Sequence, residues 1–187
     1  MSISPAGWSY GDEHEVHMIS RRDLLLGMVR RFRENSEEKP VSGIGADIVA
    51  ADDAYARKDY ETARNLYRDI LKTNRAHKEA RIYQGLCHYH LGEYIQAKDT
   101  LLMVVKTHPD EYLARLYLGL AYARRDLTEK CMDAWAGLVS PEHVFVMREI
   151  NVQRALYEMG DSMAGPDIAL AVEQAMAQGA EKMQSKA

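Results

Sequence analysis

Histidine and acidic side chains near the N-terminus are the residues whose types and spacing could bind a metal. His14 and His17 stand three residues apart beside Glu13 and Glu15, which would offer two imidazoles and a carboxylate. The surrounding segment fixes no further ligand. A solvated segment is therefore the better interpretation, and we predict no metal site.

The remaining candidates for metal or thiol chemistry are equally weak. His88 and His90 are two residues apart on a predicted helix, so they point in different directions and suit separate surface or groove positions. Cys87 and Cys131 share no Cys-x-x-Cys spacing, which argues against a zinc site and a disulfide framework. Two unpaired thiols suit a reducing compartment.

Motifs of catalytic and nucleotide-binding sites are missing from the sequence. We find no Gly-x-Ser-x-Gly, no phosphate-binding loop, no Gly-x-Gly-x-x-Gly and no His-Glu-x-x-His. The formal net charge of −4 also argues against a protein that mainly binds nucleic acid. We therefore expect no enzymatic activity, no cofactor and no nucleic-acid partner.

A helical pattern begins near Ile44 and repeats every 34 residues. The sequence from Lys58 reads Lys-Asp-Tyr-x-x-Ala, and the sequence from Gly92 reads Gly-Glu-Tyr-x-x-Ala. Such a period is typical of stacked helix pairs, because one pair is too small to bury its own apolar face. Two further sets keep the same register: the small residues Ala51, Gly85 and Gly119, and the larger residues Tyr67, Leu101 and Trp135.

This pattern resembles the tetratricopeptide repeat family, most closely at Gly92-Glu93-Tyr94-x-x-Ala97 and Leu118-Gly119-x-x-Tyr122. The resemblance implies an all-α fold, an α-solenoid of about three helix pairs. The repeats are expected over residues 44–77, 78–111 and 112–143. The first departs from the family pattern at Ala54, and the third has Thr128 in place of the corner tyrosine and a shortened second helix.

Two capping helices are expected after the repeats. Ser140 as N-cap and Pro141 at the first helical position predict a helix over residues 141–159. Gly-Pro-Asp from Gly165 predicts another over residues 166–182. These helices would cover the open end of the solenoid.

The predicted repeat domain spans residues 43–187, and residues 1–42 form an extension that is partly disordered by composition. Within the extension, Ser20 and Asp23 form a helix N-cap signature that opens a basic amphipathic helix over residues 20–34. Its Ser-Arg-Arg-Asp-Leu-Leu-Leu stretch resembles the twin-arginine motif. The docking residues expected in this segment are Arg21, Arg22, Leu24, Leu25, Met28, Arg30, Arg31 and Phe32.

The resemblance also implies a concave groove lined by the first helix of each pair. Family members that bind a C-terminal carboxylate place Asn and Lys at slots that are aliphatic here, so we expect an apolar groove without that clamp. Two interpretations stay open: a groove for a partner, or core buried by other helices. The groove residues are Ile48, Asp52, Tyr55, Ile82, Leu86, Tyr89, His90, Leu113, Leu116, Leu120 and Arg124.

These features predict a cytoplasmic adaptor that binds a helix or peptide of a partner protein in the groove. The alternative is a bacterial assembly factor or peripheral subunit of a membrane redox complex, docked at the inner face of the membrane through residues 20–34. That segment has three further interpretations: packing on the first repeat, filling the groove, or lying on an anionic membrane surface. No apolar run reaches the roughly 18 residues of a membrane span. Self-association through the groove or a repeat end is a further expectation.

Overall fold

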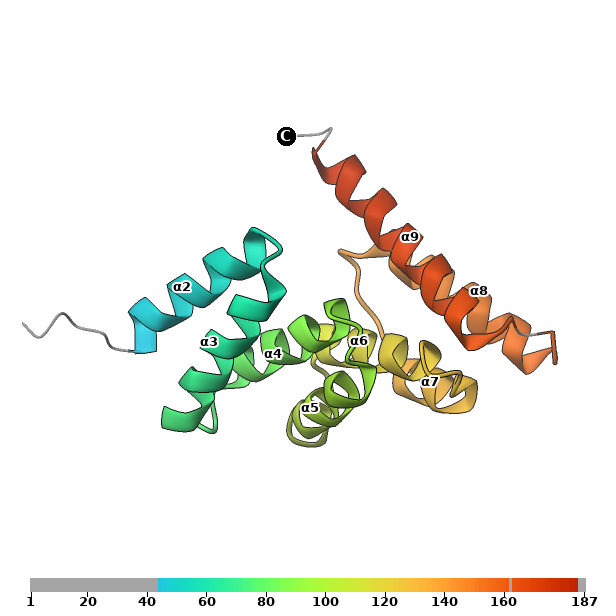
Figure 1. The fold of residues 1–187 in the computed structure, drawn as a ribbon. Coiled ribbons are helices and arrows are strands. Elements are labelled where there is room, and N and C mark those ends of the chain that lie inside the picture. The colour runs from blue at the N-terminus through green and yellow to red at the C-terminus, as the bar shows by residue number, and fades with distance from the viewer. Residues whose placement is uncertain (1–43, 162, 185–187) are drawn as a thin grey trace, which may run out of the picture. The chain divides into compact units, whose positions relative to one another are not determined.

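We describe the fold from a computed structural model, over residues 44–161 and 163–184. These residues belong to one unit of the chain, Ser42–Ala187. Within the described residues there are eight helices and no strand, which confirms the all-α solenoid (Figure 1). They are α2 (Ile44–Ala56), α3 (Tyr60–Thr73), α4 (Lys78–His90), α5 (Tyr94–Thr107), α6 (Tyr112–Ala123), α7 (Thr128–Trp135), α8 (Val144–Glu158) and α9 (Gly165–Gln184).

Each helix from α2 to α7 packs against the next one, so that three antiparallel pairs stack in chain order. The corner between the two helices of a pair has the same backbone in all three. Lys58, Gly92 and Asp126 stand 34 residues apart and have φ values of 63°, 75° and 56°. The 34-residue period seen in the sequence is therefore a period of backbone geometry.

The two sets of residues in constant register meet inside the stack. A Cβ on Gly85 would lie 2.6 Å from a methyl carbon of Leu101, and one on Gly119 would lie 2.1 Å from the indole nitrogen of Trp135. In the first pair, Ala51 and Tyr67 are both fully buried in one cluster. The small residues thus open the space that the large residues fill, and this contact holds each helix pair together.

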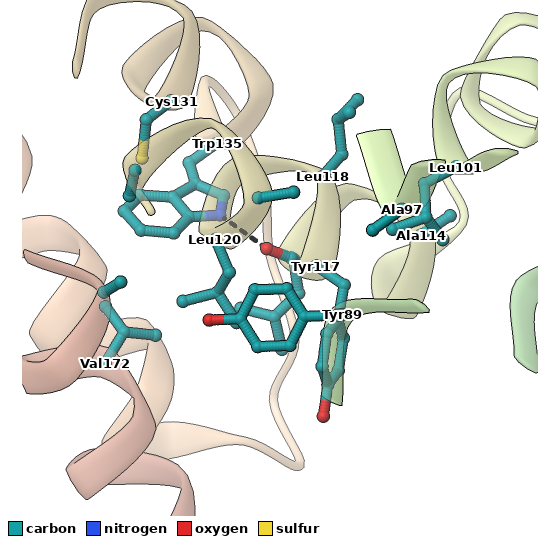
Figure 2. Close-up of a cluster of buried hydrophobic side chains, with 14 of the residues drawn as sticks. Tyr89, Ala97, Leu101, Ala114, Tyr117, Leu118, Leu120, Cys131, Trp135 and Val172 are labelled. Atoms are coloured by element: carbon teal, nitrogen blue, oxygen red, sulfur yellow. Dashed lines mark hydrogen bonds between the residues drawn. The ribbon is translucent and has the colours of Figure 1, made fainter. Parts of the chain in front are cut away.

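The last pair of the stack is the shortest. Helix α7 has eight residues, whereas α3 and α5 have fourteen each, as expected from the sequence. Cys131 and Trp135 still reach the core from this short helix and are fully buried (Figure 2).

The predicted start of the first capping helix was wrong. Helix α8 begins at Val144 rather than at residue 141. The hydroxyl of Ser140 lies 2.7 Å from Nδ1 of His143, and the backbone N–H of His143 donates to the carbonyl of Ser140 at 3.3 Å. Ser140 and Pro141 therefore form a turn before the helix instead of its first residues. Helix α9 begins and ends within two residues of its predicted bounds.

Candidate functional site

The predicted groove residues divide into a buried and a partly exposed group. Ile82, Leu86, Tyr89, Leu116 and Leu120 are at most 5% exposed and belong to the core. Ile48, Tyr55, Leu113 and Arg124 are half-buried, whereas Asp52 and His90 are exposed. The buried group fits the interpretation that these positions are core. The second group is exposed enough to fit the interpretation that they form a groove surface.

Four of these residues, Tyr55, Leu86, Leu113 and Leu116, line one apolar pocket of about 690 Å³. Its first wall comes from the repeats, through α2, α4 and α6. Its second wall comes from the start of α8 and the C-terminal half of α9, a side that repeat positions do not predict. The other lining residues are Tyr83, Tyr112, Tyr117, Glu142, His143, Val144, Phe145, Val146, Met176, Gly179, Ala180 and Lys182.

Helix α9 is placed by its first residue. The backbone N–H of Gly165 donates to Oδ1 of Asp126 at 2.9 Å, so α9 starts at the corner of the third repeat. A Cβ at this position would lie 2.4 Å from the carbonyl oxygen of Ala123, so only glycine allows the approach. From there α9 packs on α6 and α8.

The N-terminal half of α9 covers the part of the groove next to the pocket. Ile168, Ala169 and Val172 are fully buried, and Val172 points toward Leu120 of α6 (Figure 2). Glu173 follows Val172, and its carboxylate pairs with Arg124 and accepts a hydrogen bond from the hydroxyl of Tyr89. Three predicted groove residues, Tyr89, Leu120 and Arg124, are thus covered by the chain's own last helix.

Between α9 and the first repeat the surface is aromatic. The ring of His90 stacks on Tyr60 at a centroid distance of 4.4 Å, and Tyr55 contacts Tyr83 edge to face at 5.1 Å. The Tyr55 hydroxyl lies 3.4 Å from Nε2 of His90. His90 is exposed as a residue, but the packing of its ring among aromatic neighbours removes part of its water and lowers the pKa of His90, because partial burial disfavours the charged form. This surface presents flat aromatic rings, with Glu173 and Lys58 near enough to act on the charge of His90.

At the other end of the pocket, Tyr112 stacks on His143 at 4.4 Å. Its hydroxyl is buried and has no hydrogen-bond partner among the described residues. Burial raises the pKa of Tyr112 to about 12, so the phenol stays protonated and keeps a donor available. Lys182 lies over the ring of Phe145 at 4.7 Å, a cation–π contact at the same end.

The described residues show no cluster of metal ligands, and both of their cysteines are buried. Within residues 44–161 and 163–184, no three His, Cys, Asp or Glu side chains gather as metal ligands would. Cys87 is fully buried, and burial raises its pKa to about 12, so it is not a reactive thiolate. His14, His17 and the docking residues of segment 20–34 lie outside the described residues.

Stacked helix pairs with a 34-residue period define the fold class as an α-solenoid. Residues 54–120 match the family model of the tetratricopeptide repeat, a segment that runs from the end of α2 to α6. The match supports assignment of this segment to that family, whose repeats generally mediate protein–protein interaction. No helix in the described part of the chain is long and apolar enough to span a membrane.

Sequence reasoning missed the residues that α8 and α9 bring to the site. Glu173, Val144 and Ala180 lie outside the repeats, so no repeat position predicted a role for them. Met176 carries a signal that could have been found, since it falls on the apolar side of its helix in the sequence.

Proposed function

We propose that this protein is a non-enzymatic adaptor that binds a helix or peptide of a partner protein in the pocket between the repeats and α8–α9. The observation that carries the proposal is the apolar pocket of about 690 Å³, lined by both groups of helices. Apolar surfaces of this kind are expected to be covered by a partner, because water contact is unfavourable there.

The chemistry of the lining describes what would bind. Leu113 and Met176 offer aliphatic surface, and Tyr55 and Tyr83 offer flat rings. An amphipathic helix inserts a few apolar side chains into such a groove at i, i+3, i+4 and i+7 positions. We expect those side chains to supply most of the binding energy, since buried anchors dominate most interfaces.

A charge placed in the pocket tests the proposal. Val144 lines the pocket, is 63% exposed and opens α8, so Val144→Asp adds a charge without disturbing the core. An acidic residue suits the first turn of a helix, which protects the fold. Val139→Asp is the matched control, because Val139 is 76% exposed and does not line the pocket.

The measurement is comparative affinity capture of partners with the wild type and the two variants. We expect Val144→Asp to lose the proteins that wild type and Val139→Asp retain. Equal capture by all three chains would show that the pocket is not the binding site. Leu86→Asp and Leu120→Asp are unsuitable for this purpose, because both side chains are buried and a charge there would unfold the domain.

The assembly-factor role remains a prediction from the sequence, together with the cytoplasmic location and docking at the inner face of a membrane. Its residues lie in segment 20–34, outside the described part. Fractionation of cells that express the wild type or a chain lacking residues 1–42 tests it. A membrane-associated wild type that becomes soluble after the deletion would support the role, and a wild type found only in the soluble fraction would refute it.

A further inference from the structure

The carboxylate of Glu173 is held by two side chains of the repeats. The hydroxyl of Tyr89 donates to one carboxylate oxygen, and Nη2 of Arg124 donates to the other at 2.5 Å. Nε of Arg124 also donates to the Tyr89 hydroxyl at 3.4 Å. The phenol and the guanidinium therefore contact each other and together present two donors to a single carboxylate.

Both donors occupy groove positions of the repeat pattern, 35 residues apart on α4 and at the end of α6. Their acceptor comes from outside the repeats, because Glu173 is 84 residues from Tyr89 and 49 from Arg124. Helix α9 thus sits on the groove as a bound helix would, with an apolar side against α6 and an acidic side chain on Arg124.

The ion pair adjoins the pocket and remains open to water. The Arg124 and Glu173 side chains are 26% and 29% exposed. The ring of Tyr117 contacts Tyr89 at 5.2 Å and also lines the pocket, as does Met176, one helical turn after Glu173. A helix bound in the pocket would therefore bring its end close to the same guanidinium.

We propose that Tyr89 and Arg124 form a carboxylate-recognition site of which Glu173 is the internal ligand. An acidic side chain at one end of the partner's amphipathic helix replaces Glu173 there. This inference rests on the proposed function, because the helix that supplies the carboxylate is the one in the pocket. Exchange of one carboxylate for another keeps Arg124 paired, and the displaced Glu173 carboxylate, whose side chain is already 29% exposed, turns to water.

The probe is a fluorescent synthetic amphipathic peptide that carries leucines at i, i+3, i+4 and i+7 positions for the pocket and one glutamate at its end for Arg124. Its affinity for the full chain is measured by anisotropy. We expect Glu173→Gln in the chain to bind the peptide about tenfold more tightly than wild type, because the internal competitor is weakened. Glu181→Gln, the same change of charge at an exposed site of α9, should leave the affinity unchanged.

A second pair of measurements assigns the effect to the site. The gain should vanish when the peptide carries glutamine in place of its terminal glutamate, and when the chain also carries Arg124→Gln. Equal affinity of wild type and Glu173→Gln would overturn the inference, and so would a gain that survives Arg124→Gln. A Glu173→Gln chain that dimerises would also overturn it, because the exchanged helix would then come from a second copy.

Variants in the pocket separate this inference from the proposed function. If Val144→Asp weakens peptide binding and Val139→Asp does not, the pocket is the binding site, whatever Glu173 does. If both variants bind the peptide as the wild type does, the proposed function fails along with the inference. Loss at Val144→Asp without any effect of Glu173→Gln refutes the carboxylate exchange alone.

Discussion

The indole of Trp135 lies directly against the backbone of Gly119, at a distance that leaves no room for a side chain on that residue. A Cβ on Gly119 would be 2.1 Å from the indole nitrogen. The same nitrogen donates to the carbonyl of Leu116 at 3.1 Å, the dashed bond in Figure 2. Trp135 is fully buried, so α6 and α7 are joined by one packed and hydrogen-bonded contact.

Gly119→Ala should therefore destabilise the domain, although alanine is normally the better helix residue. We expect a loss of about 2–3 kcal/mol in the free energy of unfolding, because the added methyl group must push a buried ring aside. Urea unfolding followed by circular dichroism measures it. Gly179→Ala, where the nearest atom to a Cβ is 3.8 Å away, serves as control and should lose no stability. Equal stability of both variants would show that the Trp135 contact is not tight.

The contact between Gly119 and Trp135 also illustrates how much of the fold could be predicted from the sequence. Small and large residues in constant register predicted three helix pairs, because a helix crossing needs a small residue opposite a large one. The start of α8 could not be predicted from the sequence. Ser140 can act as a helix N-cap or form a turn with His143, and the structure shows the turn. Local signals settle a helix boundary only when no such competitor is present.

Only one wall of the candidate site could be predicted from the sequence, for a different reason. Repeat positions predicted the wall formed by Tyr55, Leu113 and Leu116, because each follows from the 34-residue period. The opposite wall and Glu173 depend on where α9 crosses the repeats, which is set by Gly165 at the corner of Asp126. A contact between residues 39 positions apart and outside the period leaves no pattern in one sequence.

Glu93 gives the domain an acid-sensitive link between the first two repeats. It accepts a hydrogen bond from Arg64 at 2.7 Å and lies 2.5 Å from Nδ1 of His88. Partial burial raises the pKa of Glu93, but the bonds to His88 and Arg64 outweigh it, so the net pKa is lowered. Its stabilising contribution is thus complete above the unfolded pKa of about 4.5 and is lost as the pH falls through the folded value.

We expect Glu93→Gln to cost about 1 kcal/mol at pH 7, a value reduced for the partial exposure of the carboxylate. The difference from wild type should be smaller at pH 3.5, which lies below the unfolded pKa of about 4.5. Urea unfolding at both pH values measures it. Glu61→Gln is the control, because Glu61 is more exposed and lies 3.9 Å from Arg64. A difference that is the same at both pH values would contradict the assignment.

The two cysteines should be unreactive in the folded protein. Cys87 and Cys131 are fully buried, and burial raises the pKa of Cys87 to about 12 and raises that of Cys131 as well. Since the thiolate is the reactive form, we expect no labelling by Ellman's reagent at pH 8 within minutes. Both thiols should react in urea. Rapid labelling of either one in the native protein would place it at the surface and contradict the core described here.

The central claim is that a partner occupies the pocket between the repeats and α8–α9, and site-specific photo-crosslinking tests it most directly. A benzophenone amino acid is placed at Val144, inside the pocket, or at Val139, which is more exposed and outside it. Cells expressing each chain are irradiated, and cross-linked peptides are identified by mass spectrometry. We predict that Val144 captures an amphipathic segment of another protein and Val139 does not. Equal capture from both positions, or none from Val144, would contradict the account.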